Sequence, residues 1–130
     1  MHSRKTDGPQ LVAIVSANPE TLDGLQSYLR GAGVAARGTR HLDECAELTP
    51  SATVAVVLFP DDFAREHVVA TVIDIGVRAP SILRVLVTGQ PKTFEALVET
   101  EHNLLVVPRP VWGWTILDAI RAHSDRSDPA

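Results

Sequence analysis

Short apolar runs that alternate with amphipathic, helix-like segments constrain the fold of this chain most strongly. Runs that are apolar on both faces are typical of parallel strands covered by helices on either side. Strands that alternate with helices require crossover connections, which are right-handed in nearly all proteins. The pattern predicts an α/β fold, a three-layer sandwich whose five-stranded parallel sheet has the order 2-1-3-4-5. The predicted strands cover residues 11–15, 34–37, 53–59, 83–88 and 103–107.

Helix-like segments fill the intervals between the predicted strands. Asn18 suits the cap of a first helix, Pro19 suits its first turn, and Glu20 suits its positive end. Either Asp61 or Asp62 is predicted to cap the helix that follows the third strand. The predicted helices run from residue 19 to the glycines at 31 and 33, and then over residues 42–48, 63–73, 93–100 and 111–123.

The length of 130 residues fits one domain, which we expect to span residues 10–123 between flexible tails at 1–9 and 124–130. The net charge of −4 argues against nonspecific binding to nucleic acid or to an anionic membrane, because both need surplus Lys and Arg. The longest apolar run has six residues, far short of the roughly 20 needed to cross a membrane. The start of the chain lacks a secretory signal, and its single cysteine, Cys45, cannot form an internal disulfide. We therefore expect a cytoplasmic protein.

The carboxyl ends of parallel strands meet at one edge of a sheet, where α/β proteins keep their binding sites. The residues after the first strand are neutral, and the histidines lack the spacing of zinc ligands. We therefore predict no metal site and no cofactor. The residues predicted to reach this edge are Ser16, Ala17, Asn18, Phe59, Asp61, Thr88 and Arg109.

Residues 11–123 resemble the receiver domain of bacterial response regulators. The resemblance rests on the order and spacing of the elements, on Thr88-Gly89 after the fourth strand, and on Arg109-Pro110 after the fifth. Receivers hold Mg²⁺ with acidic residues after the first strand and accept a phosphoryl group on an aspartate that ends the third. A Thr or Ser after the fourth strand and a Lys-Pro pair after the fifth complete their site. The resemblance implies the flavodoxin-like fold and a place in two-component signal transduction or a phosphorelay.

The chain departs from the receiver pattern at most of these positions. Ser16, Ala17 and Asn18 stand where the acidic residues are expected, and they supply little charge for Mg²⁺. Phe59 or the proline after it stands at the acceptor position, and Asp61 follows one or two residues late. The departures imply a degenerate receiver, or pseudo-receiver, in which Asp61 is either a helix cap or a displaced acceptor.

Two further positions differ near the fifth strand. Arg109 replaces the lysine. The positive charge is kept, but it lies on a planar guanidinium group and not on a compact ammonium group. Val106 stands at the switch position, where receivers usually carry an aromatic residue. Arg109 is predicted either to pair with Asp61 or Asp62, which would mimic the locked state of a receiver, or to be solvated. The Thr88 hydroxyl is predicted either to hold a phosphoryl group or to satisfy nearby backbone.

Three functions are compatible with these residues. We favour a stand-alone bacterial pseudo-receiver that is not an enzyme and signals by protein–protein interaction without Mg²⁺-dependent phosphorylation. The alternative is a phosphorylatable single-domain response regulator that uses Asp61 as its acceptor. The third is a small flavodoxin-like enzyme or ligand-binding domain, which the lack of a Gly-rich or Ser-rich phosphate loop after the first strand disfavours.

Trp112 and Trp114 are the residues most indicative of a partner, because Trp is favoured as an interface anchor. In a helix over residues 111–123, they are predicted to flank the stripe of Ile116, Leu117 and Ile120 on opposite sides. Either at least one Trp is exposed for docking, or both are buried at the core edge. The resemblance implies that residues 93–100, 103–107 and 111–123 form a surface for a homodimer, a kinase or an output protein, with no nucleic acid or membrane as partner.

Overall fold

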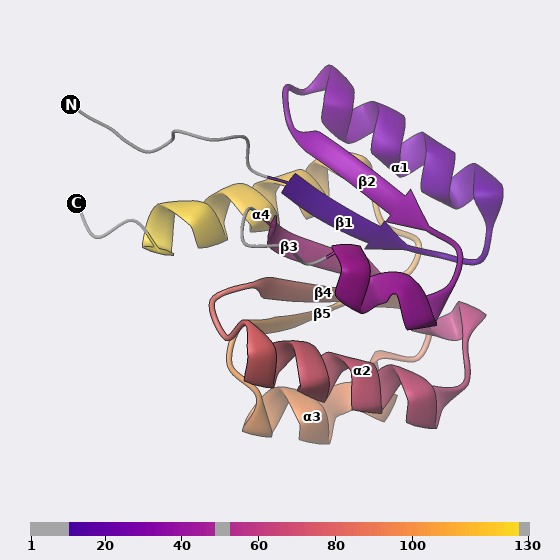
Figure 1. The fold of residues 1–130 in the computed structure, drawn as a ribbon, viewed down its shortest axis with the longest axis vertical. Coiled ribbons are helices and arrows are strands. Elements are labelled where there is room, and N and C mark those ends of the chain that lie inside the picture. Colours follow the sequence, from indigo (N-terminus) through magenta and orange to yellow (C-terminus); the bar gives the residue numbers. More distant parts are fainter. Residues whose placement is uncertain (1–10, 49–52, 128–130) are drawn as a thin grey trace.

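The computed structural model describes residues 11–48 and 53–127, which form one parallel sheet with helices on both faces (Figure 1). The strand order is β2-β1-β3-β4-β5 and every neighbouring pair is parallel. The predicted α/β sandwich and its strand order are therefore confirmed. The strands are β1 (Leu11–Val15), β2 (Ala35–Thr39), β3 (Thr53–Leu58), β4 (Leu83–Thr88) and β5 (Leu104–Pro108).

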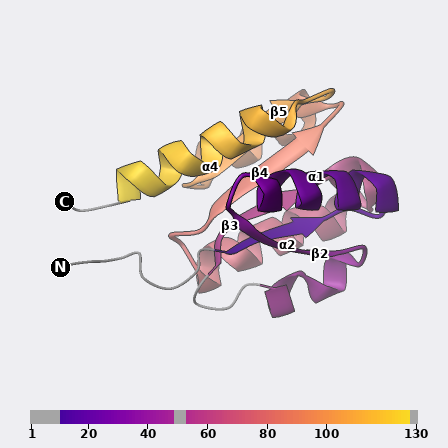
Figure 2. The ribbon, with the colours of Figure 1, turned by 90° about the horizontal axis from the view of Figure 1, so that it is seen from above.

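A separate hydrophobic core lies on each face of the sheet. Helices α1 (Pro19–Gly31) and α4 (Gly113–Ser127) close one core, and α2 (Arg65–Arg78) lies over the other with α3 (Glu95–Thr100) beside it. Figure 2 shows the same layering from above. Three short 3-10 helices complete the second layer and the connections: η1 (Leu42–Leu48), η2 (Pro60–Asp62) and η3 (Pro91–Phe94).

The first helix begins as the sequence predicts. The side-chain oxygen of Asn18 accepts hydrogen bonds from the N–H groups of Glu20 at 2.9 Å and Thr21 at 3.2 Å. These bonds satisfy donors that have no partner within the first turn of a helix. Asn18 thereby fixes the path of the chain from β1 into α1 and shapes the loop that contains Ser16 and Ala17.

The second strand is longer at its carboxyl end than predicted. Gly38 and Thr39 pair with Ile14 and Val15, so β2 reaches the same edge as β1. A Cβ atom on Gly38 would lie 2.3 Å from a methyl carbon of Leu22 on α1. Glycine leaves the space on the strand that the Leu22 side chain fills, a tertiary constraint that the local sequence does not reveal.

The predicted capping role of Asp61 and Asp62 is wrong. Helix α2 begins at Arg65, and the residue at its cap is Ala64, whose side chain makes no capping bond. The two aspartates lie in η2, which starts at Pro60. Proline suits the first position of a helical turn, so this short turn forms early and separates both carboxylates from the start of α2.

The last two helices also differ from their predicted bounds. The segment over residues 93–100 is divided into η3 and α3, and Val98 on α3 is 39% exposed. Helix α4 starts at Gly113 and continues to Ser127, beyond the predicted end at His123, while Ile116, Leu117 and Ile120 are buried as predicted. The remaining parts of the predicted tails, residues 1–9 and 128–130, lie outside the described residues.

A buried arginine joins the layers at the opposite end of the sheet from the predicted site. Arg84 on β4 is 3% exposed, and its guanidinium donates to the backbone oxygen of Val72 at 2.7 Å and to Glu101 at 2.7 Å. It also bonds the backbone oxygen of His102. A Cβ atom on Gly76 would lie 2.6 Å from the same guanidinium, so glycine leaves the space that this arginine fills.

Among the described residues, no helix combines the length and the apolar character that a membrane span requires.

Candidate functional site

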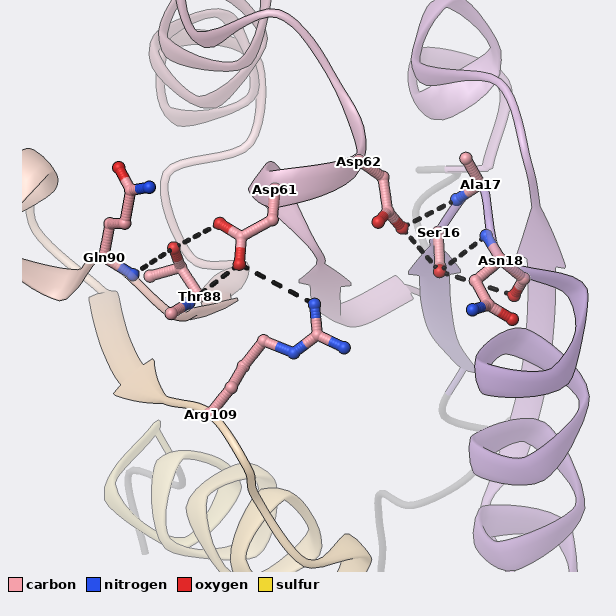
Figure 3. Close-up of polar contacts among 9 residues, drawn as sticks. Ser16, Ala17, Asn18, Asp61, Asp62, Thr88, Gln90 and Arg109 are labelled. Carbon is pink, nitrogen blue, oxygen red and sulfur yellow. Dashed lines mark hydrogen bonds and ion pairs between the residues drawn. The ribbon is translucent and has the colours of Figure 1, made fainter.

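The candidate site lies at the carboxyl edge of the sheet, where the loops after β1, β3, β4 and β5 meet (Figure 3). The structure brings Asp61, Thr88 and Arg109 together at one side of this edge. It places Ser16, Ala17 and Asn18 at the other side, against Asp62. The two clusters are therefore held by adjacent aspartates of η2.

Asp61 binds the loops after β4 and β5. One oxygen of its carboxylate accepts a hydrogen bond from the Thr88 hydroxyl at 2.5 Å, and the other accepts from the N–H of Gly89 at 2.8 Å. The Arg109 guanidinium lies 3.7 Å from this second oxygen. The predicted Arg109–Asp61 ion pair is therefore present, although it is longer than a direct hydrogen bond.

Thr88 is held firmly enough to position this contact. It ends β4 with no exposed surface, and its hydroxyl oxygen accepts a hydrogen bond from the N–H of Gln90 at 3.0 Å. The hydroxyl thus satisfies backbone and donates to Asp61 at the same time. The bond with Gln90 is a contact with nearby backbone, which is one of the two roles considered for Thr88 from the sequence.

The electrostatics of the site favour an ionised Asp61. Partial burial acts to raise its pKa, but the hydrogen bonds from Thr88 and Gly89 and the charge of Arg109 outweigh this effect. The pKa of the Asp61 carboxyl therefore lies below its usual value. The carboxylate is charged throughout the neutral pH range and can neutralise Arg109.

Asp62 binds the loop after β1. Its carboxylate accepts hydrogen bonds from the Ser16 hydroxyl at 2.8 Å and from the N–H of Ala17 at 2.9 Å. The Ser16 hydroxyl oxygen in turn accepts from the N–H of Asn18 at 3.2 Å. Sequence reasoning missed this cluster, although a serine and an aspartate after neighbouring strands could have indicated it.

The donor set at this edge does not fit Mg²⁺, the ion that the resemblance to receivers implies. The side-chain oxygen of Asn18 is used in capping α1, and Asp62 is bonded to Ser16 and Ala17. Hard divalent cations prefer several anionic oxygens, and this loop supplies neutral groups. Within residues 11–48 and 53–127, no cluster of three or more His, Cys, Asp or Glu side chains is arranged to hold a metal ion.

Phe59 is one of the two residues, with Pro60, that the sequence predicts at the acceptor position of a receiver. It is 5% exposed and belongs to the core beneath α1 and α4. The carbon at the centre of the Arg109 guanidinium lies 5.8 Å from the centre of the Phe59 ring, within the range of a cation–π contact. An apolar ring at this position supports the arginine and has no group to accept phosphate.

Val106 occupies the predicted switch position on β5. Its side chain is partly buried and packs against the core on the α2 face. An aliphatic side chain there lacks the large ring that could alternate between buried and exposed orientations.

Trp112 and Trp114 do not flank the buried stripe on opposite sides, so that prediction is wrong. Their rings are stacked, with centres 5.0 Å apart and planes 4° from parallel. Trp112 precedes the start of α4 at Gly113, so it does not take the angular position that a helix from residue 111 would give it. Trp112 is 67% exposed and Trp114 54% exposed, which excludes the alternative of two mainly buried rings.

No protein-family model matches the chain, and no curated protein sequence matches it. Solved structures do match. A response regulator receiver protein from Sinorhizobium medicae WSM419 has a TM-score of 0.79 at 12% identity, covering 92% of this chain and 98% of that one.

Two other solved structures are similar to this chain over nearly its whole length. The signal receiver domain of an HD domain-containing protein from Pseudomonas fluorescens Pf-5 has a TM-score of 0.78 at 19% identity, covering 92% of this chain and 97% of that one. A structure named adenylate cyclase from Rhodopirellula baltica has a TM-score of 0.78 at 14% identity, covering 93% and 91%. At these identities the likeness concerns the backbone, and it shows that this chain has the fold of response regulator receiver domains.

Proposed function

We propose that this protein is a signalling module of the receiver fold that acts through protein–protein contacts, without Mg²⁺-dependent phosphorylation and without enzymatic activity. The observation that carries the proposal is the Asp61 carboxylate. This carboxylate accepts hydrogen bonds from the Thr88 hydroxyl and the Gly89 N–H, and it forms an ion pair with Arg109. All three groups are suited to binding a phosphoryl oxygen. We infer that the carboxylate acts as a built-in substitute for the phosphoryl group.

These contacts support a permanent conformation of the loops after β4 and β5. In a receiver, a phosphoryl group would draw the loops after the fourth and fifth strands toward the acceptor. Here Asp61 makes the corresponding contacts with Thr88 and Arg109 from within the chain. Val106 offers no ring to reorient, so the surface around β5 would keep one form, which suits a constant docking platform.

A second candidate function is phosphorylation of Asp61 itself. Its side chain is 32% exposed, and its lowered pKa keeps it in the nucleophilic, ionised form. The donor set around it favours the first proposal, because phosphoryl transfer depends on Mg²⁺ and cationic groups that offset charge. Arg109 supplies one such cation, while Ser16 and Asn18 replace the carboxylates that would hold the metal ion.

For the partner, we propose a signalling protein, either a kinase or an output protein, or a second copy of this chain. The exposed Trp112–Trp114 stack at the start of α4 supports a contact on the surface of α3, β5 and α4. Residues 10–123 are proposed as the working domain. The proposal includes a cytoplasmic setting and excludes nucleic acid and membrane as partners, in keeping with the net charge of −4.

The direct test is an amide NMR titration with Mg²⁺ and then beryllofluoride, a mimic of a phosphoryl group. We expect no saturable shifts at Thr88, Gly89 or Arg109, because Asp61 already occupies their donors. The Asp62→Asn variant is the matched control, since it alters the neighbouring carboxylate and leaves Asp61 in place. Saturable shifts that vanish in Asp61→Asn and persist in Asp62→Asn would establish Asp61 as an acceptor and reject the proposal.

A further inference from the structure

A pocket opens between α1 and the start of α4, next to the Asp61–Arg109 pair. Its volume is about 330 Å³, near the lower end of the ~300–1,000 Å³ typical of small-molecule sites. Most of its wall is apolar, and Arg109 is the one charged side chain among the residues that line it. The apolar wall includes Leu25, Tyr28, Phe59, Val87 and Ile116.

The aromatic side of the pocket is closely packed. Tyr28 on α1 lies against Gly113, where an added Cβ atom would be 2.8 Å from its ring. Phe59 lies on the sheet side and contacts the Arg109 guanidinium. The pocket thus has two aromatic rings and one cation on its wall, a combination that favours a flat apolar group bearing a negative charge.

The Arg109 guanidinium has more N–H donors than its ion pair with Asp61 uses. A guanidinium carries five N–H groups, and the ion pair with Asp61 spans 3.7 Å through one nitrogen. In Figure 3 the remaining nitrogens of Arg109 have no dashed line to the other residues drawn. The side chain is 40% exposed, so a carboxylate in the pocket could form a bidentate pair that Asp61 does not.

We propose that this pocket binds a small aromatic carboxylate, with its ring against Tyr28 and Phe59 and its carboxylate on Arg109. The ligand competes with Asp61 for the arginine, and binding therefore couples to the loops that Asp61 holds. The binding site itself goes beyond the proposed docking function and does not require it. A failure to bind such ligands would leave the phosphorylation tests of Asp61 unaffected, so the two proposals fail separately.

Gly24 offers a variant that fills the pocket without disturbing the core. It lines the pocket from α1, and a Cβ atom added there meets no heavy atom within 4 Å. Gly24→Leu should therefore place a side chain in the open space, and replacing glycine within a helix also favours folding. Gly31→Leu is the matched control, since Gly31 is also in α1 with open space around it and does not line this pocket.

The experiment is an amide NMR titration of the full chain with phenylacetate and indole-3-acetate, each beside its neutral amide. We expect at least one acid to give saturable shifts around Tyr28, Arg109 and Gly113, and to bind about tenfold more tightly than its amide. Gly24→Leu should abolish these shifts while Gly31→Leu retains them.

Two more variants test how the charges of Arg109 and Asp61 affect ligand binding. Arg109→Gln should remove the preference for acid over amide, and Asp61→Asn should tighten binding of the acid because the arginine loses its internal anion. The proposal is overturned if neither acid binds saturably, if acid and amide bind equally to the unmodified chain, or if Gly24→Leu binds as well as Gly31→Leu.

Discussion

The adjacent carboxylates of Asp61 and Asp62 bind different loops of the candidate site. Asp61 binds the loops after β4 and β5 through Thr88 and Arg109, whereas Asp62 binds the loop after β1 through Ser16. A shift of one residue along η2 therefore exchanges one set of partners for another. Asp61 follows Phe59 by two residues and reaches Thr88 and Arg109 because η2 turns the chain at this point.

The Asp61 contacts should make a measurable, pH-dependent contribution to stability. At neutral pH, Asp61→Asn should lower the free energy of unfolding by roughly 1 kcal/mol, since a partly exposed carboxylate loses charged hydrogen bonds. Because folding lowers the pKa of Asp61, its contribution is present above the unfolded value of about 4 and is lost as pH falls through the folded value. Urea unfolding from pH 7 to pH 3 should show the difference between the two proteins shrinking below about pH 4; a constant difference would contradict it.

Arg84 should be the most sensitive charged residue of the fold. Glu101→Ala leaves its buried guanidinium without an anion, and we expect a loss of about 3 kcal/mol in the free energy of unfolding. Glu99→Ala, at an exposed position of α3 two residues before Glu101, should change the free energy of unfolding by less than about 0.5 kcal/mol. Chemical denaturation of both variants tests this, and equal effects would show that the buried pair is unimportant.

At the scale of elements, the start of α4 matters most for docking, because it presents the exposed Trp114. We predict that Trp114→Ala weakens self-association or partner binding by about 2 kcal/mol or more, with little effect on folding because the ring is 54% exposed. Val77→Ala is the control, since this residue is 76% exposed on α2 in the other layer. Sedimentation and thermal unfolding should be compared. A large fall in melting temperature with unchanged association would assign Trp114 to folding alone.

The elements show what local sequence can and cannot predict. The run of β1 is bounded as predicted, because burial on both faces leaves a continuous apolar signal. The ends of β2 and the start of α4 depend on contacts between distant segments, such as Leu22 with Gly38 and Tyr28 with Gly113. The stacking of Trp112 on Trp114 follows from that later helix start, and the predicted helix from residue 111 therefore misplaced both rings.

At the scale of the whole molecule, Cys45 reports on opening of the fold. It is 1% exposed in the core beneath α2, and burial raises the pKa of its thiol to about 11. We predict that a disulfide reagent at pH 8 labels the folded protein only through opening, so that labelling in denaturant is faster by orders of magnitude. Stopped-flow absorbance can compare both conditions. Rapid labelling of the native protein would contradict the described packing of η1.

The candidate site was only partly predictable for a related reason. Parallel topology brings the ends of β1, β3, β4 and β5 to one edge, so the proximity of Thr88, Asp61 and Arg109 followed from strand order. The capping rule favoured a local role for both aspartates, but the turn at Pro60 gave them long-range partners. The pairing of Asp62 with Ser16 depends on the exact turn geometry, which residue types alone do not specify.

We propose that the Asp61 carboxylate replaces a phosphoryl group and is not modified by one. The most direct test is the intact mass of the protein after incubation with acetyl phosphate and Mg²⁺, beside Asp61→Asn and Asp62→Asn. We expect an unchanged mass for all three proteins. Phosphate incorporation into the unmodified chain and Asp62→Asn, absent from Asp61→Asn, would contradict the claim and identify Asp61 as a phosphorylation site.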